Sequence, residues 1–144
     1  MRCRLELVLV AALASVGACD EGGDASGDDG MQTPLPVDEG PWSSFEERSC
    51  PPDSFLSFEN FGGPYLLDHC KGCHSKAIPE GMRQGAPAGV DFDTIADVRA
   101  WAPRIWARAA DQNDTMPPVG APGAEERALL GEWLACGALL HAER

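Results

Sequence analysis

The sequence predicts an all-α domain preceded by an acidic N-terminal segment. Residues at helical spacing mark one face of a C-terminal helix: Leu130, Trp133, Leu134, Gly137 and Leu140. Thr94 and Asp97 match the capping box that opens a helix. No segment alternates between apolar and polar residues as a half-buried strand does. The 16 glycines and 12 prolines cluster outside the segments with helical spacing.

The N-terminal part of the chain is predicted to target and tether the domain. Arg2 and Arg4 precede an apolar run over 7–16 that is too short to span a membrane, as in a signal peptide. The run ends in a sequence that resembles a bacterial lipobox, which predicts a signal peptide over 1–18 and a lipid on Cys19. Ordinary cleavage after Ala18 is the alternative. Residues 20–40 hold seven acids and no base, so 19–40 is expected to be a lipid anchor and disordered acidic linker.

The domain itself is expected over 58–144, with residues 41–57 packed on it as an extension without regular structure. A first helix is predicted to begin near 62–64, where Pro64 suits a first turn, and to run into Cys70. Residues 75–90 are rich in Gly and Pro and are predicted to form a loop.

The second half of the domain is predicted to hold two further helical regions. Pro103 should end or kink the helix that opens at Thr94, and a second segment should follow it. Residues 113–123 contain three prolines and cannot be regular. Glu125 and Glu126 suit the N-terminus of the last helix, where the helix dipole favours negative charge.

Residues 70–74 carry the most specific pattern in the chain. They read Cys-Lys-Gly-Cys-His, the C-x-x-C-H pattern of c-type haem attachment. Residues three and four apart in a helical turn project to the same side, so Cys70 and Cys73 can reach the two vinyl groups on one haem edge. His74 is then placed to bind the iron through an imidazole nitrogen. The pattern predicts one covalently bound haem c.

Two other interpretations of these cysteines stay open. A redox dithiol of the thioredoxin type needs a βαβ context, which the sequence does not show. A zinc site would recruit His74 with His69 or His141, but it normally needs a second pair of ligands at close spacing. Neither explains the histidine that follows Cys73 directly.

From about Gly62 to Leu140 the chain resembles a class I c-type cytochrome, a monohaem cytochrome c domain. The family places a helix before C-x-x-C-H, a methionine in a proline-rich loop some forty or more residues later, and a final amphipathic helix. Residues 114–118, Asp-Thr-Met-Pro-Pro, match that loop, and the resemblance implies that Met116 binds the iron opposite His74. It also implies a small helical domain wrapped around one haem. The rival ligands are less well placed: Met82, Met31, His141 and His69.

The resemblance implies further contacts. The family packs a small residue, eight positions before the first haem cysteine, against the last helix. Gly62 holds that position here, so Trp133 is expected to contact Gly62 or Leu66. A loop carbonyl, that of Pro87 or else Pro79, should accept the imidazole N–H of His74. Candidates for the haem propionates are side chains with N–H donors: Trp101, Arg104 and Trp106.

Two cysteines stay unassigned once the signal peptide, the lipid and the haem have taken theirs. Cys50 and Cys136 would face an oxidising compartment after export, which suggests a disulfide. The elements that carry them pack together in the family. The alternative is two inert buried thiols.

These observations favour an electron carrier rather than an enzyme. An iron held by His74 and Met116 has no open position for a substrate, which suits one-electron transfer between redox partners, either alone or as a subunit of a larger oxidoreductase. A haem enzyme or gas sensor with a labile sixth position is the alternative. The net charge of −12 argues against nucleic acid and suggests a redox partner with a basic docking rim. The expected location is the periplasmic side of a membrane, through the lipid anchor.

Overall fold

A computed structural model describes residues 40–143 of the chain. The predicted signal peptide, the lipidated Cys19 and the acidic linker up to residue 39 lie outside the described residues. Between residues 40 and 143 the chain forms three α-helices and four shorter helical turns, with no strand, so the all-α class is confirmed there. None of these helices is long and apolar enough to cross a membrane.

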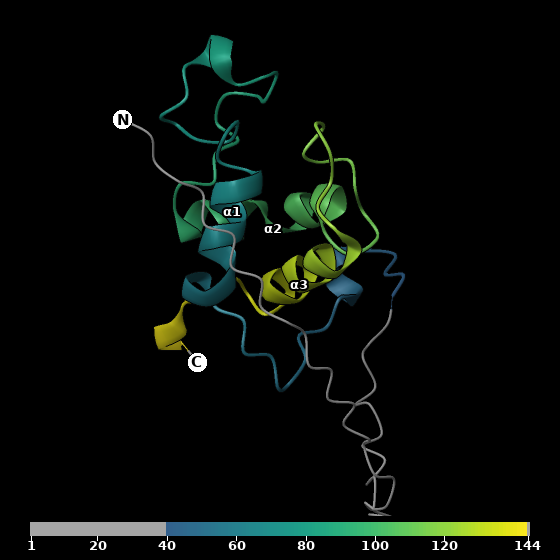
Figure 1. The fold of residues 1–144 in the computed structure, drawn as a ribbon. Helices are drawn as coiled ribbons and strands as arrows, with labels where there is room; N and C mark the ends of the chain where they lie inside the picture. The colour runs from purple at the N-terminus through teal and green to yellow at the C-terminus, as the bar shows by residue number, and fades with distance from the viewer. Residues whose placement is uncertain (1–39, 144) are drawn as a thin grey trace, which may run out of the picture. The chain divides into compact units, whose positions relative to one another are not determined.

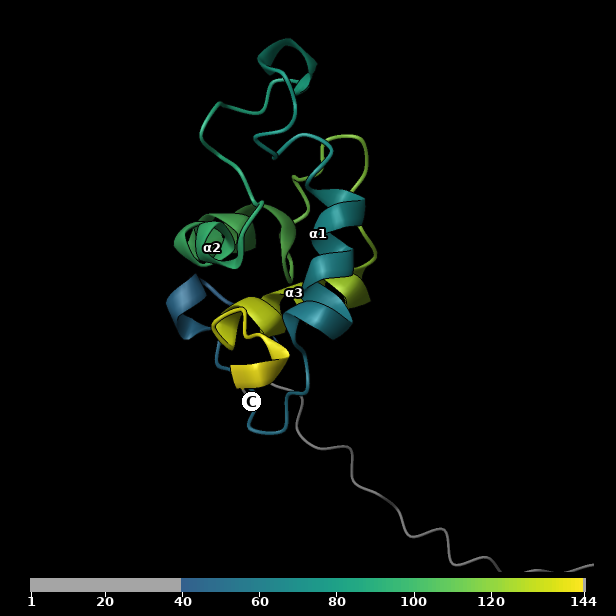
Figure 2. The ribbon, with the colours of Figure 1, turned by 90° about the vertical axis from the view of Figure 1, so that its left-hand side faces the viewer.

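The three α-helices are α1 (Gly63–His69), α2 (Ile95–Ala109) and α3 (Ala124–Ala135). Figures 1 and 2 show α1 crossing α3 at a wide angle, with α2 beside them. The short turns are η1 (Phe45–Glu47), η2 (Phe58–Gly62), η3 (Glu80–Met82) and η4 (His141–Glu143). Buried apolar side chains from all three α-helices form one core, whose largest fully buried members are Trp133, Leu66, Leu130, Leu134 and Val98.

The first helical segment starts earlier than the sequence predicts. Ser57 caps the π-helical turn η2, because its hydroxyl accepts from the N–H of Asn60 while the Asn60 side chain accepts from the N–H of Ser57. η2 then continues directly into α1. The helical segment therefore begins at Phe58, directly after its cap Ser57, and not at 62–64.

Gly62 lies where α1 meets α3. A Cβ atom added to Gly62 would stand 2.2 Å from Cζ2 of Trp133, far inside van der Waals contact. Trp133 is fully buried, and its indole N–H donates to the carbonyl of Leu139 at 3.3 Å. The expected contact between Trp133 and Gly62 is confirmed.

α2 does not end or kink into two segments at Pro103, which corrects the prediction. The capping box of Thr94 and Asp97 is present, and the helix runs on through Pro103 to Ala109. Pro103 is exposed, and so is Arg99, whose carbonyl loses its helical partner where proline lacks an N–H. Water can reach both residues, which lowers the cost of the interruption.

α3 is shorter than the predicted face. It ends at Ala135, so Gly137 and Leu140 lie beyond it. Gly137 has a φ of +80°, its N–H donates to Leu134, and the N–H of Ala138 donates to Trp133. This is a Schellman motif, in which glycine ends the helix because it adopts the left-handed conformation without strain.

Residues 41–57 pack against the core, and η1 gives them one regular turn, which corrects the expectation of an extension without regular structure. Arg48 forms a buried ion pair with Asp111 at 3.3 Å and lies over the ring of Trp42. Asp111 also accepts from the indole N–H of Trp106 at 2.6 Å. A disulfide joins Cys50 to Cys136, as the cysteine count suggests.

The disulfide should stabilise the domain measurably. It links residues 86 positions apart, and closing so long a loop restricts the unfolded chain by up to about 4 to 5 kcal/mol in the chain-entropy model. We expect Cys50→Ala/Cys136→Ala to lower the free energy of unfolding by up to that amount in denaturant titrations. Wild-type protein treated with a thiol reductant should gain two hydrogen atoms in mass from this pair and unfold at a similarly low denaturant concentration. Equal midpoints with and without reductant would contradict the assignment.

Gly62→Ala should destabilise the domain by about 1 to 3 kcal/mol or more, because the new methyl group overlaps the indole of Trp133. Gly81→Ala is the matched control, since a Cβ at Gly81 meets no atom within 4 Å and its φ is not positive. Thermal unfolding of both variants checks the prediction. Similar losses in the two variants would show that the contact with Trp133 is not the cause.

Candidate functional site

The Cys70–His74 turn follows directly on α1. The N–H of Cys70 donates to the carbonyl of Leu66 at 3.0 Å, which carries the helical pattern past His69. The N–H groups of Cys73 and His74 then donate to the carbonyl of Cys70 at 3.1 and 2.9 Å. The turn is therefore helical in its hydrogen bonding, as the spacing argument for two thiols on one side requires.

Both cysteines of this turn are free thiols with half-buried side chains. Burial raises the pKa of Cys70 to about 12. A catalytic dithiol needs a thiolate, which a lowered pKa would favour. The surroundings of Cys70 work in the opposite direction.

His74 is held in one orientation and one tautomer. Its Nδ1 lies 2.9 Å from the carbonyl oxygen of Val90, and its ring stacks on Phe92 with the centroids 4.7 Å apart. A carbonyl only accepts, so Nδ1 carries the proton. In the neutral ring Nε2 is then the nitrogen without a proton, and its lone pair can bind a metal.

The carbonyl beside His74 corrects the prediction of Pro87 or Pro79. The carbonyl of Pro87 accepts from Arg83 at 3.0 Å, and that of Pro79 accepts from the N–H of Met82 at 2.8 Å. Val90 is placed instead because the N–H of Phe92 donates to the carbonyl of His74 at 2.9 Å. This backbone bond brings the end of the loop, rather than its middle, against the imidazole.

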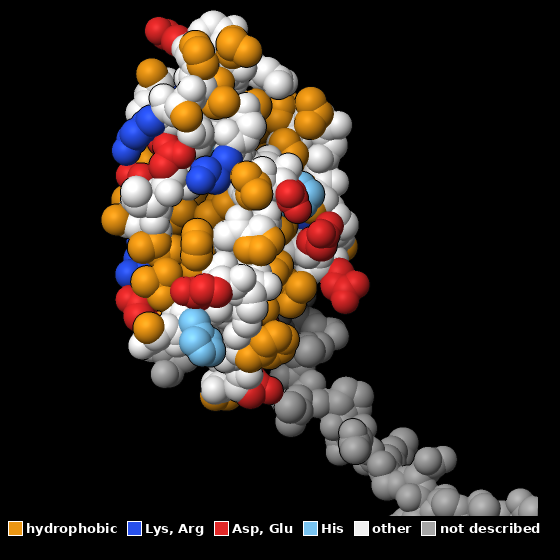
Figure 3. Space-filling model, turned by 60° about the vertical axis from the view of Figure 1, so that its left-hand side comes forward, with side chains coloured by type: hydrophobic (Ala, Val, Ile, Leu, Met, Phe, Trp, Pro, Cys, Tyr) orange, Lys and Arg blue, Asp and Glu red, His pale blue; other side chains and the backbone are white. Residues whose placement is uncertain are grey.

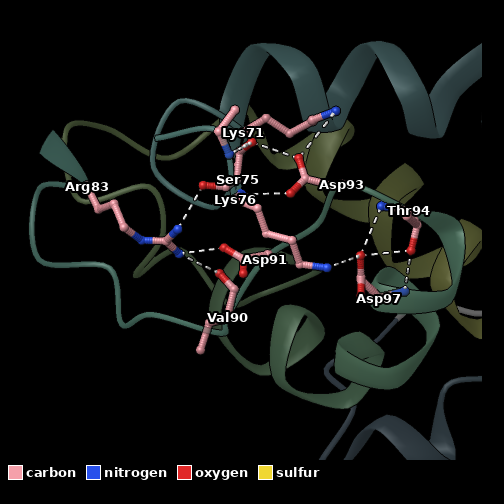
Figure 4. Close-up of polar contacts among 10 residues, drawn as sticks. Lys71, Ser75, Lys76, Arg83, Val90, Asp91, Asp93, Thr94 and Asp97 are labelled. Carbon is pink, nitrogen blue, oxygen red and sulfur yellow. Dashed lines mark hydrogen bonds and ion pairs between the residues drawn. The ribbon is translucent and has the colours of Figure 1, made fainter. Parts of the chain in front are cut away.

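Polar side chains fix the loop between His74 and α2 (Figure 4). The Asp93 carboxylate accepts from the hydroxyl of Ser75 and the N–H of Lys76, both at 2.7 Å. These bonds, with the backbone bond from Lys76 foremost, lower the pKa of Asp93. Lys76 also pairs with Asp97 in the α2 cap at 3.6 Å. The loop is therefore tied both to the Cys70–His74 turn and to the start of α2.

Met116 lies on an irregular loop, as the prolines predict, and its backbone is anchored. Its N–H donates to the carbonyl of Arg108 at 2.9 Å, and the Thr115 hydroxyl donates to the same carbonyl at 3.1 Å. The Met116 side chain is 38% exposed. Both views show this loop and the Cys70–His74 turn at the same end of the domain (Figures 1 and 2). The structure thus gathers Cys70, Cys73 and His74 in one turn and carries Met116 on a neighbouring loop.

The rival ligands among the described residues lie elsewhere or are engaged. Met82 is 68% exposed on η3. His69 packs against Tyr65 and lies 4.0 Å from Glu126. His141 belongs to η4, after the end of α3. Met31 lies outside the described residues.

The three candidates for the haem propionates differ in their surroundings. The indole N–H of Trp106 is bonded to Asp111, so Trp106 is not free to bind a propionate. Arg104 is exposed on α2, and Trp101 is half-buried against the core. Arg104 and Trp101 stay predictions.

Arg83, the residue on which the loop folds, was not predicted from the sequence. Arg83 is 4% exposed and donates to four backbone carbonyls. Nothing in the sequence marks it as buried, since it lies among glycines and prolines that indicate an exposed loop. Phe92, which stacks on His74, was also missed.

Other features of the described residues do not add to this site. Within 40–143, no three His, Cys, Asp or Glu side chains are grouped as metal ligands. A surface groove lies between η1, α2 and α3, but its lining contains no Cys, His or Met: Phe45, Arg99, Ala102, Pro103, Leu134, Ala135 and Gly137.

No protein-family model, curated protein or solved structure matches the chain.

Proposed function

We propose that the protein is a monohaem c-type cytochrome that carries single electrons between redox partners. The observation that carries this proposal is the Cys70–His74 turn, in which two free thiols three residues apart precede an imidazole that the bond from Nδ1 to Val90 orients, so that the neutral ring offers Nε2 to a metal. The donor set fits haem c: two thiols for the vinyl groups, an oriented imidazole, and the thioether of Met116 on an anchored loop.

Each residue has a defined part in this proposal. Cys70 and Cys73 add their S–H groups across the two vinyl double bonds, so that no atom is lost. His74 and Met116 would both hold the iron, which would leave no position for a substrate. The bound haem supplies reversible one-electron chemistry at iron, and the thioether of Met116 favours the reduced form.

The exposed apolar side chains support electron exchange at this end of the domain. Most of the large hydrophobic side chains that are exposed between residues 40 and 143 belong to α1 or to the two loops beside the Cys70–His74 turn: Leu67, Met82, Met116 and Val119. Figure 3 shows hydrophobic side chains spread between the charged ones on the face of the domain that carries α1. A redox partner with a basic rim would complement the net charge of −12 on the whole chain.

The pattern of the N-terminal sequence supports a location outside the cytoplasm, as a lipoprotein anchored through Cys19 and facing the periplasm. Cys19→Ala should abolish incorporation of a radiolabelled fatty acid while the haem is still attached. Labelling that persists in this variant would contradict lipidation at Cys19.

Covalent haem attachment is the first test. The chain, exported in cells that mature c-type cytochromes, should be red, and its denatured mass should equal that of the processed polypeptide plus one haem. Cys70→Ala/Cys73→Ala should lose the covalent haem, because it removes both attachment sites. A colourless wild-type protein that binds zinc through the same turn would support a zinc or thiol module instead.

The second test concerns Met116. Met116→Ala should abolish the charge-transfer band of methionine-ligated oxidised haem in the red and lower the reduction potential, by on the order of 100 mV within the ~0.8 V range that axial ligands span. Met82→Ala is the matched control, since Met82 is more exposed than Met116 and should leave both readouts unchanged. If the reduced wild-type protein binds carbon monoxide readily, the sixth position is labile, and a gas sensor or haem enzyme is favoured over a carrier.

A further inference from the structure

A buried ion pair lies behind His74. The side chains of Arg83 and Asp91 are 4% and 6% exposed, with Nη2 of Arg83 2.7 Å from Oδ1 of Asp91. Removing both charges from water carries a large desolvation penalty, which an isolated pair does not always recover. The attraction between Arg83 and Asp91 alone therefore does not explain why both side chains are buried.

Arg83 uses its guanidinium as a multiple donor to the loop. Nη1 donates to the carbonyl of Ser75 at 2.8 Å and Nε to that of Ala86 at 3.3 Å. Nη2 donates to the carbonyls of Pro87 and Val90 at 3.0 and 3.1 Å. These two bonds use both Nη2 protons, and Oδ1 of Asp91 accordingly has no hydrogen bond, so charge alone holds it there.

The Val90 carbonyl is shared between Arg83 and His74. It accepts from Nη2 of Arg83 at 3.1 Å and from Nδ1 of His74 at 2.9 Å, using its two lone pairs (Figure 4 shows the Arg83 contact). A carbonyl that already accepts from a cation is a weaker acceptor for a second donor. The Nδ1 proton of His74 is then drawn less strongly toward Val90, and Nε2 donates less electron density than it would beside a free carbonyl.

We propose that Arg83 is a positioning residue that sets the donor strength of His74 through the Val90 carbonyl, and so raises the reduction potential of the haem. The inference rests on the proposed function, because it assigns a role toward a haem bound by His74. It assigns to Arg83 a contact with His74's hydrogen-bond acceptor and none with the haem itself.

The test measures the reduction potential of the purified haem protein and of three variants. Arg83→Met removes both the charge and the bond to Val90 and should shift the reduction equilibrium about tenfold toward the oxidised form, which is about 59 mV for one electron. Arg83→Met/Asp91→Leu removes one positive and one negative charge, so the net charge is unchanged. Only the effect through Val90 should remain, and it should shift the reduction equilibrium about threefold toward the oxidised form. Arg83→Lys keeps the charge but lacks the planar fork that reaches four carbonyls. Its reduction equilibrium should also shift about threefold toward the oxidised form.

Arg99→Met is the matched control. It removes the same charge, but within residues 40–143 the Arg99 side chain donates to Gly137, Ala138 and Glu143, beyond the end of α3. Its potential should stay within the error of the wild type. Covalent haem content and the methionine charge-transfer band should be measured in every variant, to show that attachment and ligation are intact.

The outcomes separate the inference from the proposed function. If the wild type holds no covalent haem, the proposed function fails. If the wild type holds haem but Arg83→Lys and the double variant both keep the wild-type potential, Arg83 acts through charge alone and the inference is overturned. A rise in potential in either variant overturns it as well. If the double variant does not fold, the potential of Arg83→Lys decides.

In the reduced protein, the Nδ1 proton of His74 gives a second readout. Its NMR signal should move downfield in Arg83→Lys, because the bond to Val90 strengthens when the competing donor is lost. An unchanged signal would show that the carbonyl is not shared in solution, and it would overturn the inference.

Discussion

The crossing of α1 over α3 is the constraint on which the candidate site depends. The two segments approach so closely that the space of a single methyl group at Gly62 is already filled by the indole of Trp133. Two hydrogen bonds extend the contact, since the N–H of Phe58 donates to the carbonyl of Leu139 and the N–H of His141 donates to the Glu59 carboxylate. These contacts together fix the start of α1. Because α1 is only two turns long, it also fixes the direction in which Cys70 leaves it.

Local sequence patterns predicted those parts of the fold that depend on neighbouring residues. The capping box at Thr94 and the irregular loop around Met116 could both be found without the structure, whereas the glycine at the interhelical contact was implied only by the resemblance. Ser57 and Asn60 form a capping pair that was readable but overlooked, because asparagine stands where glutamate is usual. The prediction failed at Pro103, because whether a proline breaks a helix depends on the exposure of the freed carbonyl, which only the packed domain determines.

The site divides in the same way. The ligand pattern of Cys70, Cys73 and His74 lies within five consecutive residues, so its helical spacing follows from the sequence. The hydrogen-bond partner of His74 does not follow from the sequence, because Val90 is 16 residues away. The choice among several carbonyls depends on how the loop folds on Arg83. The side chain of an arginine in a glycine-rich segment is expected to be exposed to solvent. Its burial becomes visible only when four carbonyls and Asp91 are seen to surround it.

The disulfide requires that one pair of cysteines be oxidised while the other pair stays reduced. In the proposed haem protein, four cysteines of the domain would meet the same oxidising surroundings, and one pair would form a cross-link while the other stayed as thiols until haem attachment. A reductant that protects Cys70 and Cys73 must leave the other pair alone. Cys136 is buried but Cys50 is exposed, so in the folded domain a soluble thiol would attack this disulfide at the Cys50 sulfur. The packing that brings Cys50 to Cys136 would favour re-formation of the bond after such an attack, which would separate the fate of this pair from that of Cys70 and Cys73.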